Sequence, residues 1–135
     1  MTPVLLTDIE RAVRSSWGAD TCTPDHRPHW NAGNPARDQC GVTALVLHDL
    51  LGGELLRGEV LVAGERVDFH WWNRLADGLE VDLTREQFAP HEHVTEGVAV
   101  PRPARIVRLR EEYELLRDRV REQLEGQRQG PGSAR

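Results

Sequence analysis

The feature that most limits the possible folds is a change in the spacing of apolar residues at Gly52-Gly53. Residues 40–51, before the two glycines, are almost all apolar, which is typical of a buried helix, and glycine is a common helix stop. After the glycines, the segments 55–62, 66–75 and 79–83 have the length and residue types of β-strands. A buried helix followed by consecutive strands predicts an α+β domain.

Short turns separate the three strand segments, so we expect them to form a small antiparallel β-meander. The turns are Ala63-Gly64-Glu65 and Ala76-Asp77-Gly78, both rich in turn-forming residues. Residues 84–87 have the form of a capping box and predict a short helix or turn after the third strand. Residues 90–103 lack a periodic pattern and predict a loop.

The length of the second turn decides which side chains share a face. A three-residue loop at 76–78 pairs Leu75 with Leu79 and puts His70 diagonally next to Asp82 on one face, whereas a two-residue loop separates them. The three-residue register also collects the more apolar side chains on the opposite face, which favours it as the core. These are Phe69, Trp71, Leu75, Leu79, Val81 and Leu83. The buried helix must then reach His70 and Asp82 at a sheet edge, or cover their face.

An amphipathic helix is predicted before this centre. Leu5, Ile9, Val13 and Trp17 repeat at close to the helical period, and Thr2-Pro3 is a good helix start, so we expect a helix over residues 3–17. Residues 18–38 are rich in Pro, Asp, Asn, Gly and His and predict a long loop. Loops of this length inside a domain are usually functional.

A second amphipathic helix is predicted at the other end of the chain. Apolar residues spaced three or four apart among Arg and Glu predict a long helix over 106–128. We expect one domain at 1–105, this helix as an addition that packs on the sheet or meets a partner, and a flexible tail at 129–135. The heptad-like spacing of the apolar stripe also allows a homodimer.

Charge and composition exclude several classes of function. The 135 residues contain 17 arginines and no lysine, which excludes a lysine nucleophile and the lysine of a phosphate-binding Walker A loop. Residues 1–101 are strongly acidic, so we expect no nucleic-acid partner. Without a membrane-length apolar run or a signal-peptide core, a cytoplasmic protein that does not bind membranes is expected, with Cys22 and Cys40 as free thiols.

Cys40 stands where a thiol can be activated. At the start of the predicted helix, free N–H groups and the helix dipole are expected to lower the pKa of the thiol, and the same groups can hold an oxyanion. The side-chain amide of Gln39 is a further oxyanion donor, or a cap for the helix. Along the chain, Cys40, His70 and Asp82 follow the order of nucleophile, base and orienting group in papain-like and transglutaminase-like enzymes.

Several short motifs appear in a specific order between about residues 17 and 95. They are Asn34-Pro35 with Gln39-Cys40-Gly41-Val42-Thr43-Ala44, then Leu51-Gly52-Gly53-Glu54, then His70-Trp71-Trp72-Asn73-Arg74-Leu75 with Asp77-Gly78, and Asp82-Leu83-Thr84-Arg85-Glu86-Gln87-Phe88. In these motifs the chain resembles the YunG-like family of small, largely uncharacterised bacterial proteins. The resemblance implies a papain-like or transglutaminase-like fold.

The resemblance also implies roles for individual residues. Cys40 is expected to be the nucleophile, His70 its base and Asp82 the partner of His70. The residues expected to line a cleft are Trp30, Asn34, Trp71, Trp72 and Asn73. The predicted function is thiol-dependent acyl chemistry without a cofactor, by amide or ester hydrolysis, deamidation or acyl transfer, on a small-molecule or peptide substrate.

Two other interpretations stay open at this point. Cys40 and His70 can be ordinary core residues of a non-catalytic domain that binds a partner through the Trp-lined cleft or the C-terminal helix. Histidines at 26, 29, 91 and 93 with a cysteine can supply zinc ligands. However, no CxxC pair or HExxH helix is present, so we expect no metal site.

Overall fold

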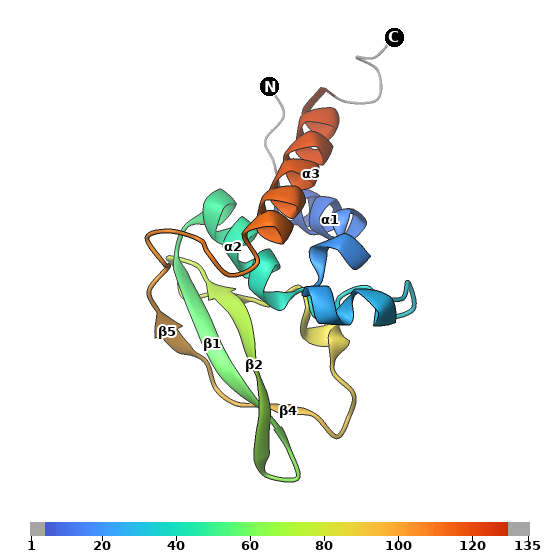
Figure 1. Ribbon diagram of the computed structural model, residues 1–135. Coiled ribbons are helices and arrows are strands. Elements are labelled where there is room, and N and C mark those ends of the chain that lie inside the picture. The colour runs from blue at the N-terminus through green and yellow to red at the C-terminus, as the bar shows by residue number, and fades with distance from the viewer. Residues whose placement is uncertain (1–4, 130–135) are drawn as a thin grey trace.

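A computed structural model describes residues 5–129 of the chain, without the side chains of 127–129. The helices gather at one end of the molecule, and a curled antiparallel sheet extends away from them (Figure 1). The α-helices are α1 (Leu6–Ser16), α2 (Cys40–Leu51) and α3 (Arg110–Gln129). The strands are β1 (Glu54–Val62), β2 (Glu65–Arg74), β3 (Glu80–Val81), β4 (His93–Val94) and β5 (Val98–Val100). Short 3-10 helices are η1 (Ala19–Thr21), η2 (Pro24–His29) and η3 (Arg85–Gln87). The predicted α+β class is confirmed.

The buried helix α2 has the bounds predicted from its apolar run. Val42, Val46 and Leu47 are at most 2% exposed, which is why this segment is apolar around most of its circumference. Gly52 ends the helix with φ of 69°, a conformation that favours glycine, and its N–H donates to the His48 carbonyl at 2.9 Å. The helix therefore ends directly at the start of β1.

The sheet has the strand order β3-β2-β1-β4, and β5 pairs with β1 as well. Strands β1, β2 and β3 form the predicted meander, although β3 is shorter than the segment 79–83. The prediction of an unstructured loop over 90–103 is wrong, because this region contains β4 and β5. Both strands pair antiparallel with β1, so their structure comes from a long-range partner and not from a local pattern.

The three-residue turn between β2 and β3 is confirmed. Asn73 pairs with Val81, and the Leu75 N–H donates to the Leu79 carbonyl at 2.8 Å, which is the predicted register. The Asp77 carboxylate accepts a hydrogen bond from the Leu79 N–H at 3.0 Å and supports the turn. His70 and Asp82 consequently lie on the same face of the sheet.

The predicted core face packs against the helices, with Val81 in the main core and Leu75 and Leu83 against it, although Leu79 is 50% exposed. The face of His70 is buried as well, which the sequence did not predict: His70 is 0% exposed and Trp72 is 3% exposed. The reason is that the chain after β3 folds back over the His70 face. The ring of Phe88 lies edge-on to His70 with centroids 4.7 Å apart, and Gly97 leaves room for the Trp72 ring.

The two outer helices form one core with α2. This core contains Ile9, Ala12 and Val13 from α1, Trp17 directly after it, and Tyr113, Leu116, Val120 and Leu124 from α3. The apolar stripe of the C-terminal helix is therefore already buried within the chain, against α1 and α2 and not against the sheet. It is an integral part of the core and not an addition to the domain.

The ends of the outer helices differ from the prediction in their details. Helix α1 begins at Leu6, and the predicted start at Thr2-Pro3 lies outside the described residues. Helix α3 begins at Arg110, because Leu109 has φ of 56° and interrupts the helical backbone predicted from residue 106. Of the predicted tail at 129–135, only Gln129 is described, and it ends α3. Within residues 5–129, no helix combines the length and apolar character that crossing a bilayer requires.

Candidate functional site

His70 and Asp82 form a hydrogen-bonded pair beneath the curled end of the sheet. His70 Nε2 lies 2.7 Å from Asp82 Oδ2, and because a carboxylate can only accept, Nε2 carries the shared proton. Arg85 Nε donates to the same oxygen at 2.7 Å. The imidazole is held between two aromatic rings, stacked on Trp72 at 5.3 Å and edge-on to Phe88. The ring is thus fixed in both position and tautomer.

The other ring nitrogen of His70 has no partner. Nδ1 is buried and makes no hydrogen bond within the described part of the chain. With Nε2 protonated, Nδ1 of the neutral ring is an acceptor. A buried acceptor without a donor costs about 1–3 kcal/mol, and native proteins contain few such atoms. This nitrogen is therefore free to receive a proton.

Cys40 lies at the edge of the sheet directly beside His70. Its sulfur accepts a hydrogen bond from the backbone of Trp71, the residue after the histidine. Strand β3 pairs with β2 only at Asn73 and Arg74, which leaves the edge of β2 at Trp71 open to the start of α2. Of the two arrangements that the sequence allows, the helix thus reaches the pair at a sheet edge.

The environment of the Cys40 thiol is the reverse of the predicted one. Burial raises the pKa of Cys40 to about 12, and although the Trp71 hydrogen bond lowers it, the carboxylates of Asp68, Asp38 and Asp82 raise it further. The expected lowering of this pKa by the helix start is therefore wrong for this conformation. The thiol also makes no hydrogen bond with His70, whose Nδ1 is unpartnered. The structure brings His70 and Asp82 together, and the thiol near them is protonated.

Gln39 has neither of the roles predicted for it. Its side chain is fully buried, its oxygen accepts from Thr21 Oγ1 at 2.7 Å, and its nitrogen donates to the Gly18 carbonyl at 3.1 Å and lies 3.2 Å from Cys22 Sγ. It makes no side-chain cap on α2. These contacts occupy the amide, so Gln39 acts as a buried bridge and not as an oxyanion donor.

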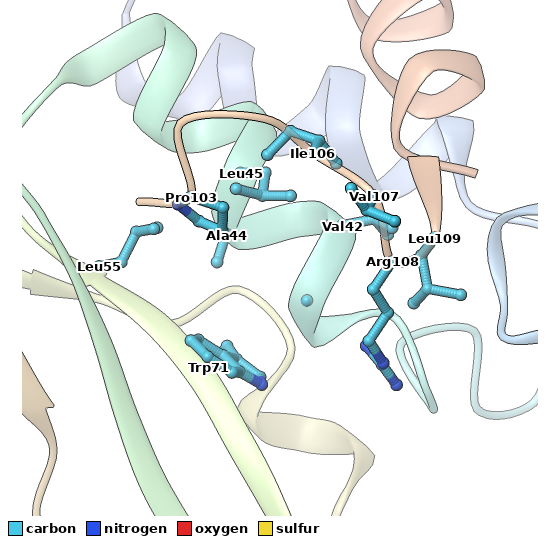
Figure 2. A pocket seen from close by; sticks show the side chains of 11 residues that line it. Val42, Ala44, Leu45, Leu55, Trp71, Pro103, Ile106, Val107, Arg108 and Leu109 are labelled. Atoms are coloured by element: carbon cyan, nitrogen blue, oxygen red, sulfur yellow. The ribbon is translucent and has the colours of Figure 1, made fainter. Parts of the chain in front are cut away.

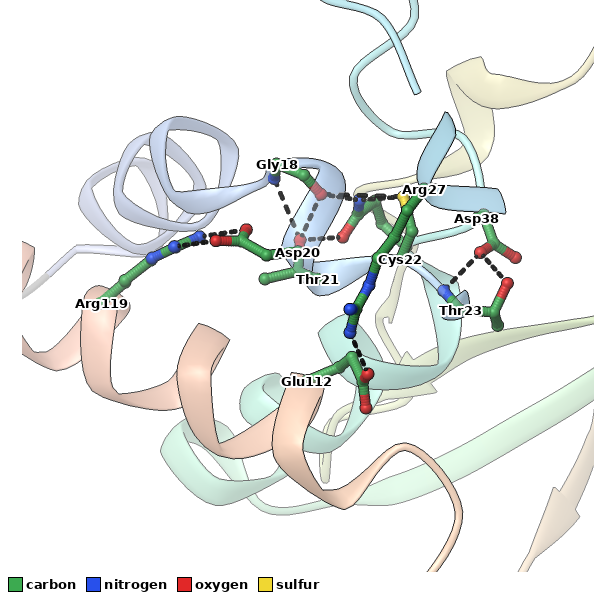
Figure 3. A network of polar contacts seen from close by, with 10 residues as sticks. Gly18, Asp20, Thr21, Cys22, Thr23, Arg27, Asp38, Glu112 and Arg119 are labelled. Carbon is green, nitrogen blue, oxygen red and sulfur yellow. Dashed lines mark hydrogen bonds and ion pairs between the residues drawn. The ribbon is translucent and has the colours of Figure 1, made fainter. Parts of the chain in front are cut away.

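The long loop at 18–38 is held by a network of polar contacts around this bridge (Figure 3). Asp38 accepts from the Thr23 hydroxyl at 2.6 Å, and Arg119 of α3 pairs with Asp20. Arg27 reaches Glu112 of α3 at 2.6 Å. Burial raises the pKa of the Cys22 thiol to about 12. The network attaches the loop to α3 and positions the residue before Cys40.

Most of the residues predicted to line a cleft hold the structure together instead. Trp30 Nε1 donates to the Pro35 carbonyl at 3.1 Å, and Asn34 Nδ2 donates to the Gln87 carbonyl at 3.1 Å. Trp72 and Asn73 are at most 3% exposed and donate to Glu80 and to the Ala44 carbonyl. Trp71 is the member of this set that lines a cavity.

That cavity lies between α2, the sheet and the segment 103–109, which we call the strap (Figure 2). Its volume is about 160 Å³. The lining residues are Gly41, Val42, Ala44, Leu45, Leu55, Trp71, Pro103, Ile106, Val107, Arg108 and Leu109. The strap is hard to recognise in the sequence, because its apolar residues continue the helical spacing of α3. The signal that sets it apart is that residues 101–110, which include it, contain four arginines and no acidic residue.

The zinc interpretation finds no support in the described residues. Within residues 5–129, no three side chains of metal-binding type come together. His26 and His29, the pair at helical spacing, have ring centroids 6.0 Å apart. The remaining candidate chemistry is that of Cys40, His70 and Asp82.

Comparison with known proteins identifies the relatives of this chain. A curated protein of Bacillus subtilis (strain 168), described as uncharacterized protein YunG, is 33% identical over 88 residues, which are 63% of this chain and 65% of the relative. The match thus spans slightly less than two thirds of that relative's length. No solved structure matches the chain. The family model described as YunG protein matches residues 5–125, including α1 and most of α3. The chain therefore belongs to the YunG protein family.

Proposed function

We propose that this protein carries out acyl chemistry at Cys40, with His70 as the base and Asp82 as the group that orients it. The observation that carries the proposal is the state of the imidazole: Nε2 is fixed by Asp82 at 2.7 Å while the buried Nδ1 is left without a donor. A structural histidine would satisfy both nitrogens at lower cost. Cys40, whose sulfur is hydrogen-bonded to the backbone of the next residue, Trp71, is the thiol placed to supply the proton.

The proposed reaction begins with a protonated thiol. Because the pKa of Cys40 is raised to about 12, the proton moves to Nδ1 as the sulfur attacks the carbonyl carbon of an ester or amide. The C–S bond forms, the oxyanion faces the first N–H groups of α2, and the imidazolium returns the proton to the leaving group. Water or another acceptor then releases the acyl group. Since the chain has no lysine, an amine acceptor has to come from the N-terminus or from another molecule.

The same arrangement supports, as part of this proposal, a distant relation to papain-like and transglutaminase-like enzymes. In both cases a cysteine at a helix start stands beside neighbouring antiparallel strands that carry a histidine and an acidic partner. Here those strands are β2 and the end of β3, and the helix is α2.

Acylation with p-nitrophenyl acetate, followed by intact-mass and peptide mass spectrometry, tests the proposal. We expect one acetyl group on Cys40 and a rate about 10²–10⁴-fold lower in His70→Gln, because the general base is lost. Asp82→Asn should reduce the rate without abolishing it. Cys22 is the internal control, since this buried thiol also has a pKa raised to about 12 and contacts Gly18, Arg37 and Gln39, with no hydrogen bond to a histidine among the described residues. Equal acetylation of wild type and a folded His70→Gln variant would refute the proposal.

A second candidate is a non-catalytic binding domain. The observations that favour it are the apolar cavity lined by Trp71 and the raised pKa of the nearby Cys40 thiol, which disfavours the nucleophilic thiolate. In that case no acetyl adduct forms on Cys40, and a Cys40→Ser variant binds the ligand as well as wild type does. Binding through the apolar stripe of α3 is not favoured, because that stripe is buried against α1 and α2.

A further inference from the structure

We infer that the cavity beneath the strap is a binding site for a small apolar carboxylate, with a ring or branched chain of about the size of benzene inside the cavity and Arg108 at the carboxylate. This inference goes beyond the proposed acyl chemistry and does not require Cys40 to react. If the chemistry also holds, the site is the acyl pocket, because residues next to the nucleophile and the base, Gly41 and Trp71, form its wall.

The apolar part of the ligand follows from the size and lining of the cavity. Apart from Arg108, all of the lining side chains are apolar, and one of them is the indole of Trp71. The volume of about 160 Å³ is close to the roughly 150 Å³ of an engineered apolar cavity that binds benzene. A cavity of this kind favours a compact hydrocarbon group over a polar one or a long chain.

The charge of the ligand follows from the strap. The strap and its flanking residues, 101–110, contain four arginines and no acidic residue, in a protein with net charge −5. Arg102 is engaged by Asp49 at 2.9 Å, and Arg110 by Glu114 at 3.2 Å. Arg108 lines the cavity, and within residues 5–129 it has neither an ion pair nor a hydrogen bond (Figure 2). A guanidinium beside an apolar cavity selects an anion, and it fits a carboxylate with two parallel hydrogen bonds.

The strap is attached in a way that allows a ligand to enter. At one end Arg102 donates to His48 and to the Tyr113 hydroxyl, and at the other the Leu109 carbonyl accepts from the Tyr113 N–H. Between these anchors, no backbone hydrogen bonds of residues 103–108 to other described residues occur, and Val107 is 76% exposed. The middle of the strap can therefore move outward without breaking backbone hydrogen bonds.

Isothermal titration of the full-length chain with phenylacetate, and with the neutral isostere phenylacetamide, tests the inference. We expect phenylacetate to bind about three- to tenfold more tightly, because the carboxylate gains a charge-assisted hydrogen bond. Arg108→Gln should remove this preference. Arg105→Gln is the matched control, since it removes the same charge from an exposed strap residue that does not line the cavity, and it should leave the preference intact.

A second variant tests the location. A Cβ added at Gly41 meets no atom within 4 Å, and Gly41 lines the cavity, so Gly41→Leu should extend into the cavity and abolish binding of both probes. Its melting temperature should stay the same or rise, because leucine is a better helix former than glycine.

Three results would overturn the inference. They are the absence of saturable phenylacetate binding up to about 10 mM, equal binding by wild type and a folded Gly41→Leu variant, and equal affinity for the acid and the amide. Phenylacetate has no leaving group, and phenylacetamide cannot acylate a thiol that is absent, so Cys40→Ser should bind both probes with the wild-type preference. A failure here is therefore distinguishable from a failure of the acyl chemistry, which is measured by acetylation of Cys40.

Discussion

Replacing Gly97 with alanine should destabilise the protein and disturb the candidate base together. The added Cβ would lie 2.4 Å from Trp72 Cζ2 and 2.8 Å from Cη2, where ordinary contacts are 3.4–4 Å. The indole must therefore move by about 1 Å, which is the scale of misfit that overpacking produces. However, it is 3% exposed, hydrogen-bonded to Glu80 at 2.8 Å and stacked on His70. Displacement of the Trp72 indole should therefore shift the His70 imidazole that is stacked on it.

The size of this destabilisation can be estimated from substitutions that overpack protein cores. Such substitutions cost about 1–3 kcal/mol in the free energy of unfolding. At about 2 kcal/mol, a domain of this length should lose roughly 6–10 °C in melting temperature. The φ angle of Gly97 is outside the left-handed region, so the loss is steric and does not come from backbone strain.

Thermal unfolding followed by circular dichroism, with near-ultraviolet spectra to report on Trp72, measures this prediction. Gly126→Ala is the matched control: its Cβ meets nothing within 4 Å, and in the last turn of α3 it should raise stability by less than about 1 kcal/mol. The two glycine-to-alanine changes are thus expected to have opposite signs. If Gly97→Ala melts at or above the wild-type temperature, the close packing of Trp72 against Gly97 is refuted.

Two further predictions concern the helix layer and one ion pair. Leu116→Ala should lower the free energy of unfolding, measured in urea, by about 2–5 kcal/mol, because Leu116 is 0% exposed in the core. Arg121→Ala, at an exposed position of α3, should change it by less than about 0.5 kcal/mol. Similar losses in the two variants would mean that α3 does not complete the core. Arg37, which bonds both oxygens of Glu92, lowers the pKa of that carboxyl. Because the pKa of Glu92 is lower in the folded than in the unfolded chain, ionised Glu92 stabilises the folded state at pH values above its unfolded pKa of about 4.3. This stabilisation is lost as the pH falls through the folded pKa. The stability lost in Arg37→Gln should therefore shrink between about pH 6 and pH 3, and a pH-independent difference would contradict the pairing.

The parts of the fold that depend on local chemistry could be predicted from the sequence. The bounds of α2 follow from one apolar run and Gly52-Gly53, and the register of β2 and β3 follows from a three-residue turn. That register led directly to the His70–Asp82 pair. In each case the residues that decide the structure lie within about ten positions of one another, so a pattern in the sequence contains the needed information.

The parts that depend on distant neighbours could not be predicted. Strands β4 and β5 are two and three residues long and exist because β1 has an open edge. The pKa of Cys40 depends on burial and on carboxylates from three other segments, which outweigh the helix start. Gln39 looked like an oxyanion donor because it precedes the thiol, but its amide is taken by a loop about twenty residues earlier.

The core that joins α1 to α3 has a consequence for how the protein is made. Ile9 and Val13 share one core with Val120 and Leu124, more than one hundred positions later. A ribosome adds about 5–20 residues per second, so α1 has to wait several seconds for its partner helix to be synthesised. During that interval the apolar faces of α1 and α2 are uncovered, and they are natural binding sites for nascent-chain chaperones. A shortened mRNA that lacks the codons for α3, or a ribosome that stalls before them, should therefore yield a chain that aggregates or is degraded.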